Sequence, residues 1–283
     1  MSEKHPFVVS AYWLEENLEM PGLSIVDGSW YLPVQERNAR AEYDEAHIPS
    51  AVFFDQDRVV DPDSDLPHAL PEPLTFEQFA SSMGISERDT IVVYDGPGFF
   101  SAPRVWWMFR VMGADKVFIL DGGFDRWRAQ ERPVTDEPTR IAPAAFVPRF
   151  DESRVASLDE MRGIVEDGKM QIADARPPGR FTGAEPEPRA GMRSGHMPGA
   201  RNVPATALSE NGSLLPPERL RKTLQEAGLD LNKPVVTSCG SGVTAAAITF
   251  ALETLGHKEN KLYDGSWSEW GSRNDTPVVT EDE

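Results

Sequence analysis

Short apolar runs alternate along the chain with longer stretches in which apolar residues recur at helical spacing. Residues 91–94 and 117–120 are such runs; they are rich in β-branched residues and each is followed by Asp. Runs of this kind are typical of strands buried on both faces. Residues 13–18, 76–83 and 220–227 have helical spacing. The alternation predicts an α/β fold, with a mostly parallel sheet covered by helices on both faces.

The pattern occurs twice, in the same order and at an offset of 143 to 149 residues. Four pairs of short segments are similar: 25–29 and 172–176, 47–51 and 196–200, 91–95 and 235–239, and 121–124 and 264–267. Because the order is kept and the offset drifts slowly, we expect two copies of one structural unit.

The two copies are separated by a segment with four prolines, residues 132–151. Proline at this density prevents a regular helix and cannot donate to a sheet ladder. We therefore predict a first domain at residues 1–131, a linker at 132–151 and a second domain at 152–283. A length of 283 residues suits two domains, since one domain commonly holds ~100–200 residues.

The only cysteine, Cys239, directly follows the apolar run 235–238 and precedes a glycine-rich loop and a predicted helix at 245–255, which Gly256 would cap. In open α/β sheets this corner binds ligands. The loop N–H groups and the helix N-terminus favour an anion, so we expect Cys239 to be an activated thiolate. The alternative is a buried small apolar residue. Asp95 takes the matching place in the first copy, which predicts no equivalent nucleophile there.

Charge and composition exclude several classes of protein. A formal net charge of −18 argues against a nucleic-acid partner, and no segment approaches the ~20 apolar residues that span a bilayer. The polar N-terminus lacks a secretory or transit signal, so a cytoplasmic location is expected. A lone cysteine builds neither a thiolate-rich zinc site nor a Cys-x-x-Cys redox pair. A cysteine phosphatase needs an arginine six positions after the cysteine, where this chain has Ala245.

The loop from Cys239 to Thr244 resembles the active-site loop of the 3-mercaptopyruvate sulfurtransferases, a family within the rhodanese superfamily. Residues 27–33, 101–110 and 263–270 also match that family, so the resemblance extends over nearly the whole chain. Thiosulfate-specific relatives typically carry an Arg-Lys pair after the cysteine, where this chain has Gly240 and Ser241. The resemblance implies two tandem rhodanese-like domains, with the active site between them.

The same resemblance implies roles for individual residues. Arg180 and Arg189 would bind the carboxylate and carbonyl of the substrate, which suits the paired hydrogen bonds of a guanidinium. The alternative is that they are surface partners of Glu185 and Glu187. Ser241, His68 and Asp57 would form a proton relay, or His68 and Asp57 would be loop residues or an interdomain hydrogen bond. The loop residues that would surround the sulfur are Gly240, Gly242, Val243 and Thr244.

The implied activity is transfer of sulfur from 3-mercaptopyruvate, a small α-keto thiol acid, through a Cys239 persulfide to a thiol or cyanide, with release of pyruvate. Neither a metal nor an organic cofactor is expected. Thioredoxin is a candidate thiol acceptor by the same resemblance. Two alternatives stay open: a thiosulfate:cyanide sulfurtransferase, and a non-catalytic module that relays persulfide sulfur from a donor protein.

Overall fold

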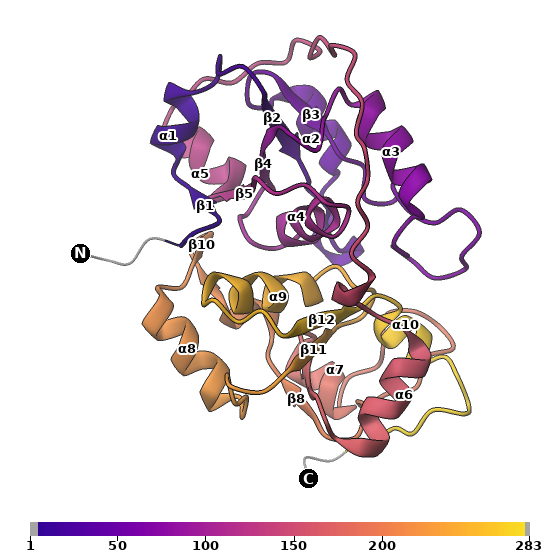
Figure 1. Ribbon diagram of the computed structural model, residues 1–283. Helices are drawn as coiled ribbons and strands as arrows, with labels where there is room; N and C mark the ends of the chain where they lie inside the picture. Colours follow the sequence, from indigo (N-terminus) through magenta and orange to yellow (C-terminus); the bar gives the residue numbers. More distant parts are fainter. Residues whose placement is uncertain (1–4, 281–283) are drawn as a thin grey trace.

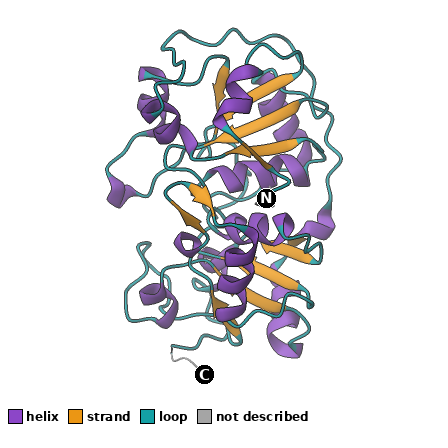
Figure 2. Cartoon of the chain, turned by 90° about the vertical axis from the view of Figure 1, so that its left-hand side faces the viewer, coloured by secondary structure: helices purple, strands orange, loops and turns teal. Residues whose placement is uncertain are grey.

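The computed structural model describes residues 5–280 and contains two five-stranded parallel sheets. The first has the order β1-β5-β4-β2-β3 and the second β6-β12-β11-β7-β8. Their strands are Val8–Val9 (β1), Leu23–Asp27 (β2), Ala51–Phe53 (β3), Thr90–Tyr94 (β4), Val117–Leu120 (β5), Val155–Ala156 (β6), Gln171–Asp174 (β7), Ala200–Asn202 (β8), Val235–Ser238 (β11) and Asn260–Tyr263 (β12). The two orders are equivalent, which confirms the duplication and the α/β fold. We call the two units the first and second domain (Figure 2).

Helices cover both faces of each sheet (Figure 1). They are Ala11–Glu16 (α1), Ala39–Glu45 (α2), Pro73–Ser82 (α3), Ala102–Val111 (α4), Gly123–Ala129 (α5), Leu158–Asp167 (α6), Pro178–Thr182 (α7), Pro217–Glu226 (α8), Ala245–Thr254 (α9) and Ser266–Trp270 (α10). The helices α3 and α8 begin three residues before their predicted starts, because each opens with a proline that is preorganised for the first helical position. Within residues 5–280, no helix combines the length and apolar character needed to cross a membrane.

The two domains meet through α4 and α9, which lie side by side between the sheets (Figure 1). Trp106 on α4 meets Phe250 on α9 edge to face, with 4.8 Å between the ring centroids. Both side chains are fully buried and belong to one apolar cluster that extends through both domains. A shared core of this kind fixes the two domains relative to each other.

The proline-rich segment between the domains packs against the first domain. Between Gln130 and Asp151, all of them described, the chain forms no helix or strand, as the prolines predict. Phe146 is nevertheless fully buried, and its ring centroid lies 5.3 Å from that of Phe76. The Thr139 hydroxyl donates to the Ala51 carbonyl over 2.6 Å. The boundaries at 131/132 and 151/152 themselves stay a prediction.

A short antiparallel hairpin of the second domain reaches the first. Its strands are Ser209–Glu210 (β9) and Ser213–Leu214 (β10). The Gly122 N–H donates to the Gly212 carbonyl over 2.9 Å. Three single-turn 3₁₀ helices complete the fold, at Pro33–Gln35 (η1), Glu152–Arg154 (η2) and Ala205–Ala207 (η3). The hydrophobic pattern predicted neither the hairpin nor these turns.

Candidate active site

Cys239 lies at the carboxyl end of β11, where the sequence placed it. Its side chain is buried, and its N–H donates to the Ser266 Oγ over 3.2 Å. The Trp267 N–H donates in turn to the Cys239 carbonyl over 2.9 Å. The first two residues of α10 therefore hold the N–H and the carbonyl of the cysteine.

The two loop glycines are needed for different reasons. Gly242 has φ +81°, a left-handed conformation that favours glycine. Gly240 has ordinary backbone angles, but a Cβ there would stand 3.0 Å from the Arg180 Nη2. Gly242 thus shapes the loop, and Gly240 leaves space for the arginine above it. Val243 is buried, and Thr244 is the residue before the first turn of α9.

The matching loop of the first domain surrounds a carboxylate. Asp95 accepts four backbone N–H bonds of 2.6 to 2.9 Å, from Gly98, Phe100, Ser101 and Ala102. Burial raises the pKa of Asp95, and these donors oppose that rise. A loop of this type therefore directs several N–H groups at the side chain of the residue that opens it.

The second loop has its left-handed glycine at the same place as the first loop but is one residue shorter. Gly98 and Gly242 each stand three positions after the opening residue, with φ of +82° and +81°. The next helix begins at Ala102 in the first domain and at Ala245 in the second, one position sooner after the opening residue. Phe99, left-handed at φ +56°, is the extra residue of the first loop. The N–H groups equivalent to those that hold Asp95 then belong to Gly242, Val243, Thr244 and Ala245.

Three residues from the two domains form a hydrogen-bonded chain. The Ser241 Oγ lies 3.0 Å from the His68 Nδ1, and the His68 Nε2 lies 2.9 Å from the Asp57 Oδ1. Because the Asp57 carboxylate accepts, Nε2 carries the proton and Nδ1 can accept from the serine hydroxyl. The hydrogen bond from His68 holds the pKa of Asp57 below its usual value, and the indole N–H of Trp30 adds a second bond of 3.0 Å. The structure thus brings these three residues together.

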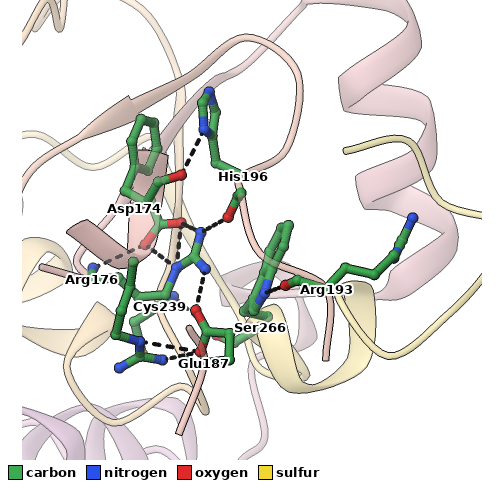
Figure 3. Close-up of polar contacts among 12 residues, drawn as sticks. Asp174, Arg176, Glu187, Arg193, His196, Cys239 and Ser266 are labelled. Carbon is green, nitrogen blue, oxygen red and sulfur yellow. Dashed lines mark hydrogen bonds and ion pairs between the residues drawn. The ribbon is translucent and has the colours of Figure 1, made fainter. Parts of the chain in front are cut away.

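Arg180 is held by a buried carboxylate. Its Nε donates to the Glu187 Oε2 over 3.1 Å, and its Nη2 donates to the same oxygen. Glu187 also accepts from Arg176 over 2.8 Å, and Arg176 pairs with Asp174 over 2.7 Å (Figure 3). The side chains of Arg176 and Glu187 are each 1% exposed. Pairing of Arg180 with Glu187 was the alternative to substrate binding, and the structure contains it, in a buried network rather than on the surface.

The sequence reasoning did not single out Arg176 or the role of Glu187. One signal was present: Arg176 follows the strand residue Asp174 by two positions, where the first copy has Ser29 after Asp27. The Arg176 guanidinium also lies 4.2 Å over the ring of Trp267. Arg176 and Arg180 share Glu187, so the position of Arg180 depends on Arg176. Arg176 is far from the cysteine loop in the sequence.

Arg189 differs from Arg180 because, among residues 5–280, no carboxylate lies within ion-pair distance of it. Burial lowers the pKa of Arg189, as does the charge of Arg180, whereas Cys239, Glu187 and Asp57 raise it. These charges act on Arg189 through space, whereas Arg180 is held by direct hydrogen bonds to Glu187. In the described part of the chain, no three His, Cys, Asp or Glu side chains are grouped to hold a metal ion.

Comparisons with known proteins agree with this geometry. A model described as the rhodanese-like domain matches residues 10–130 and 157–273. The 3-mercaptopyruvate sulfurtransferase of Escherichia coli strain K12 is 42% identical over 271 residues, covering 95% of this chain and 96% of that protein. The thiosulfate sulfurtransferase of Cricetulus griseus is 42% identical over 271 residues, covering 93% of this chain and 91% of that protein.

Solved structures agree as well. The crystal structure of SseA from Escherichia coli, a 3-mercaptopyruvate sulfotransferase, superposes with a TM-score of 0.86 at 39% identity, covering 93% of this chain and 99% of that chain. Tum1 from Saccharomyces cerevisiae superposes with a TM-score of 0.88 at 31% identity, covering 99% of this chain and 100% of that chain.

Proposed function

The chain belongs to the rhodanese family, and on that premise we propose that it is a sulfurtransferase that carries sulfur from 3-mercaptopyruvate on Cys239. The observation that supports this most directly is the Ser241–His68–Asp57 chain, which two domains assemble on the loop of the only cysteine. A buried structural cysteine would need no such chain. The proposal covers a small-molecule donor and a thiol or cyanide acceptor.

In the first half-reaction the Cys239 thiolate attacks the sulfur of mercaptopyruvate. The carbon–sulfur bond breaks, its electron pair passes to carbon, and the enolate of pyruvate leaves. The proton of the substrate thiol ends on the methyl carbon of pyruvate, through Ser241 and His68. Asp57 holds His68 in the tautomer that accepts from the serine. The products are pyruvate and a Cys239 persulfide anion.

Arg189 would bind the substrate carboxylate, because no carboxylate of residues 5–280 lies within ion-pair distance of its guanidinium and the charge of Cys239 acts on it. Arg180 would contribute the donors that Glu187 leaves free. The Arg176–Glu187 pair fixes the direction of Arg180, so less conformational freedom is lost when substrate binds.

In the second half-reaction a thiol, or cyanide in an assay, attacks the outer sulfur and releases Cys239. The N–H groups of the cysteine loop would hold the persulfide anion between the two steps. Thioredoxin is the acceptor that we propose, and a cytoplasmic location is proposed with it. Two half-reactions on one covalent intermediate predict ping-pong kinetics.

Thiosulfate is a second candidate donor. The relatives that match at 42% identity include proteins named for thiosulfate as well as for mercaptopyruvate. Gly240 and Ser241 favour mercaptopyruvate, since they leave the loop without the cationic side chains that suit a doubly charged donor.

One comparison tests the proposal: kcat/KM for mercaptopyruvate and for thiosulfate, with the same thiol acceptor and with pyruvate release followed in parallel. We expect mercaptopyruvate to be preferred, with one sulfur atom added to Cys239 by mass spectrometry when acceptor is withheld. Cys239→Ser is the control and should release no pyruvate. A preference for thiosulfate would select the second candidate. Sulfur on Cys239 only after mixing with a protein donor would select the persulfide relay module.

A further inference from the structure

A buried arginine of the first domain joins the two halves of the candidate site. Arg104 lies in the first turn of α4 and is 1% exposed. Its Nη2 donates to the His68 carbonyl over 2.6 Å and lies 2.7 Å from the Asp264 Oδ1 of the second domain. The other Asp264 oxygen accepts the Leu70 N–H over 2.7 Å. Arg104 and Asp264 therefore grip the backbone on both sides of residue 69.

These contacts fix the backbone beside His68, and that backbone sets the position of the His68 side chain. His68 has φ +59°, a left-handed conformation that a non-glycine residue keeps only when its surroundings impose it. Three hydrogen bonds hold the backbone after it. Arg104 donates to the His68 carbonyl, the Asp61 N–H donates to the Ala69 carbonyl over 3.0 Å, and the Leu70 N–H donates to Asp264. The direction of the imidazole toward Ser241 depends on that backbone.

The same pair also contacts the cysteine loop. A Cβ on Gly242 would stand 3.0 Å from the Asp264 carbonyl and 3.1 Å from the Arg104 Nη1. Two residues after Asp264, Ser266 accepts the Cys239 N–H. One ion pair thus contacts the backbone of His68, approaches the loop glycine and lies two residues before the start of α10, which anchors Cys239.

An ordinary interface salt bridge explains this arrangement poorly. A buried ion pair gains little over apolar residues of similar size, because both charges lose their hydration. The Arg104 Nη1 is buried and has no hydrogen-bond partner among residues 5–280, and the Asp264 Oδ1, although 2.7 Å from the Arg104 Nη2, is not aligned for a hydrogen bond. Both facts add to that loss. The benefit of the pair is better sought in the geometry that it imposes.

We propose that Arg104, paired with Asp264, is a positioning residue for sulfur transfer that sets the His68 imidazole relative to Ser241 across the domain interface. This inference rests on the proposed function, because it requires His68 to take part in the reaction. Arg104 touches neither substrate nor sulfur; it acts through His68.

Arg104→Lys tests the proposal, since lysine keeps the charge but cannot contact the His68 carbonyl and Asp264 with one planar group. We expect kcat with mercaptopyruvate to fall by roughly 10- to 100-fold, the effect of a displacement near ~1 Å in a reacting group, and KM to change little. Asp264→Asn should lower kcat in the same way. Arg110→Lys is the matched control: this arginine also lies on α4, but its Nη1 donates to the Asp115 carbonyl. Its kcat should equal that of the parent.

The decisive measurement repeats Arg104→Lys in a His68→Ala background. If Arg104 acts through His68, adding Arg104→Lys to the His68→Ala variant should change kcat by less than about 2-fold. The reason is that the effects of groups that act as one unit are not additive. An equal loss of kcat in both backgrounds would overturn the proposal and assign Arg104 to the fold. Thermal unfolding of each variant identifies a folding defect, which would appear equally in both backgrounds.

The two proposals fail in different ways. Full turnover in His68→Ala alone would overturn the relay and, with it, the role of Arg104. Slow turnover in His68→Ala together with normal turnover in Arg104→Lys would overturn only the inference about Arg104.

Discussion

The loop at Asp95 and the loop at Cys239 are two versions of one corner. Both follow the central strand of a five-stranded sheet and lead into a buried helix at the domain interface. The first loop folds around its own carboxylate, which takes four N–H bonds. The second opens with a thiol and is one residue shorter. The same corner thus holds a carboxylate in one domain and the only cysteine in the other, so the opening residue decides whether the loop can carry sulfur.

Each loop is also covered by a segment of the other domain. The chain that follows β3 brings His68 and Leu70 to the second loop, and the chain that follows β8 brings the β9–β10 hairpin to the first. A Cβ on Gly212 would stand 2.5 Å from the Pro97 carbonyl, so backbone lies directly against backbone there. The segment over the second loop carries a titratable side chain, His68, whereas the hairpin over the first loop contacts it through Gly212.

The largest effect is expected when the second loop is given the opening residue of the first. Cys239→Asp should abolish sulfur transfer, because a carboxylate accepts no sulfur. The protein should remain folded, since Gly242, Val243, Thr244 and Ala245 would then donate to the new carboxylate. Differential scanning calorimetry should find Cys239→Asp at least as stable as Cys239→Ser, whose side chain is too short to reach those donors. A lower melting temperature for the aspartate variant would show that the shorter loop is no anion cradle.

The two loops also differ in the arginines beside them. In the first domain the Arg37 guanidinium lies over Gly96, as Arg180 lies over Gly240, and each pairs with a glutamate. Only the second domain adds Arg189. Arg189→Ala should raise KM for mercaptopyruvate about 100-fold, from two lost charge-assisted bonds of ~1.5 kcal/mol each. Steady-state kinetics measures this.

A control for the loss of positive charge is Arg201→Ala, an exposed arginine of the same domain, which should leave KM unchanged. Unchanged kinetics in Arg189→Ala would remove Arg189 from the pocket.

The first loop can be broken without touching the chemistry of the second. Asp95→Ala should lower the free energy of unfolding by about 2–4 kcal/mol, because four buried N–H groups lose their acceptor. Asp95→Asn keeps one acceptor oxygen and should cost less. Urea denaturation measures both, and sulfur transfer by the folded variants should match the parent. An alanine variant as stable as the parent would mean that the four bonds contribute nothing.

A smaller difference lies one strand away. Asp174 of β7 pairs with Arg176, whereas Asp27 of β2 has Ser29 at that place and accepts its N–H over 2.9 Å. Burial without a cation raises the pKa of Asp27 to about 7. Its carboxyl is therefore neutral in the folded state at pH values where the unfolded chain ionises, so the native state loses stability as the pH rises from about 4 to about 7.

Asp27→Asn should remove this loss. We expect a gain of roughly 1–3 kcal/mol in unfolding free energy at pH 8, shrinking as the pH falls toward 4. Urea titrations at several pH values would measure it, and Asp174→Asn, which breaks a buried ion pair, should destabilise the protein instead. A gain for Asp27→Asn that did not depend on pH would contradict the assigned ionisation.

The sequence was sufficient for features that depend on neighbouring residues. Val117–Leu120 and Val235–Ser238 are strands with the predicted bounds, and the linker is irregular because of its prolines. His68, Asp57 and Ser241 came from family resemblance, and no local pattern would have found them. The rest depends on contacts between distant segments. Burial of Phe146, the Arg176–Glu187 pair and the Arg104–Asp264 pair each join residues that have no periodic relation in the chain.

Phe146 has a mechanical consequence. The proline-rich linker cannot act as a hinge between the domains, because it is attached to the first domain along its length. Phe146, Thr139 and Arg149 make these contacts. The residues that follow are held as well, because the Asp151 N–H donates to the Val111 carbonyl over 2.9 Å and Arg154 pairs with Glu253. The helices α4 and α9 join the domains on the other side. The two domains are therefore held as one rigid unit during the reaction. A hinge motion between the domains is therefore not expected to open the candidate site. Any rearrangement that admits a donor or an acceptor to the buried Cys239 would be confined to the surrounding loops.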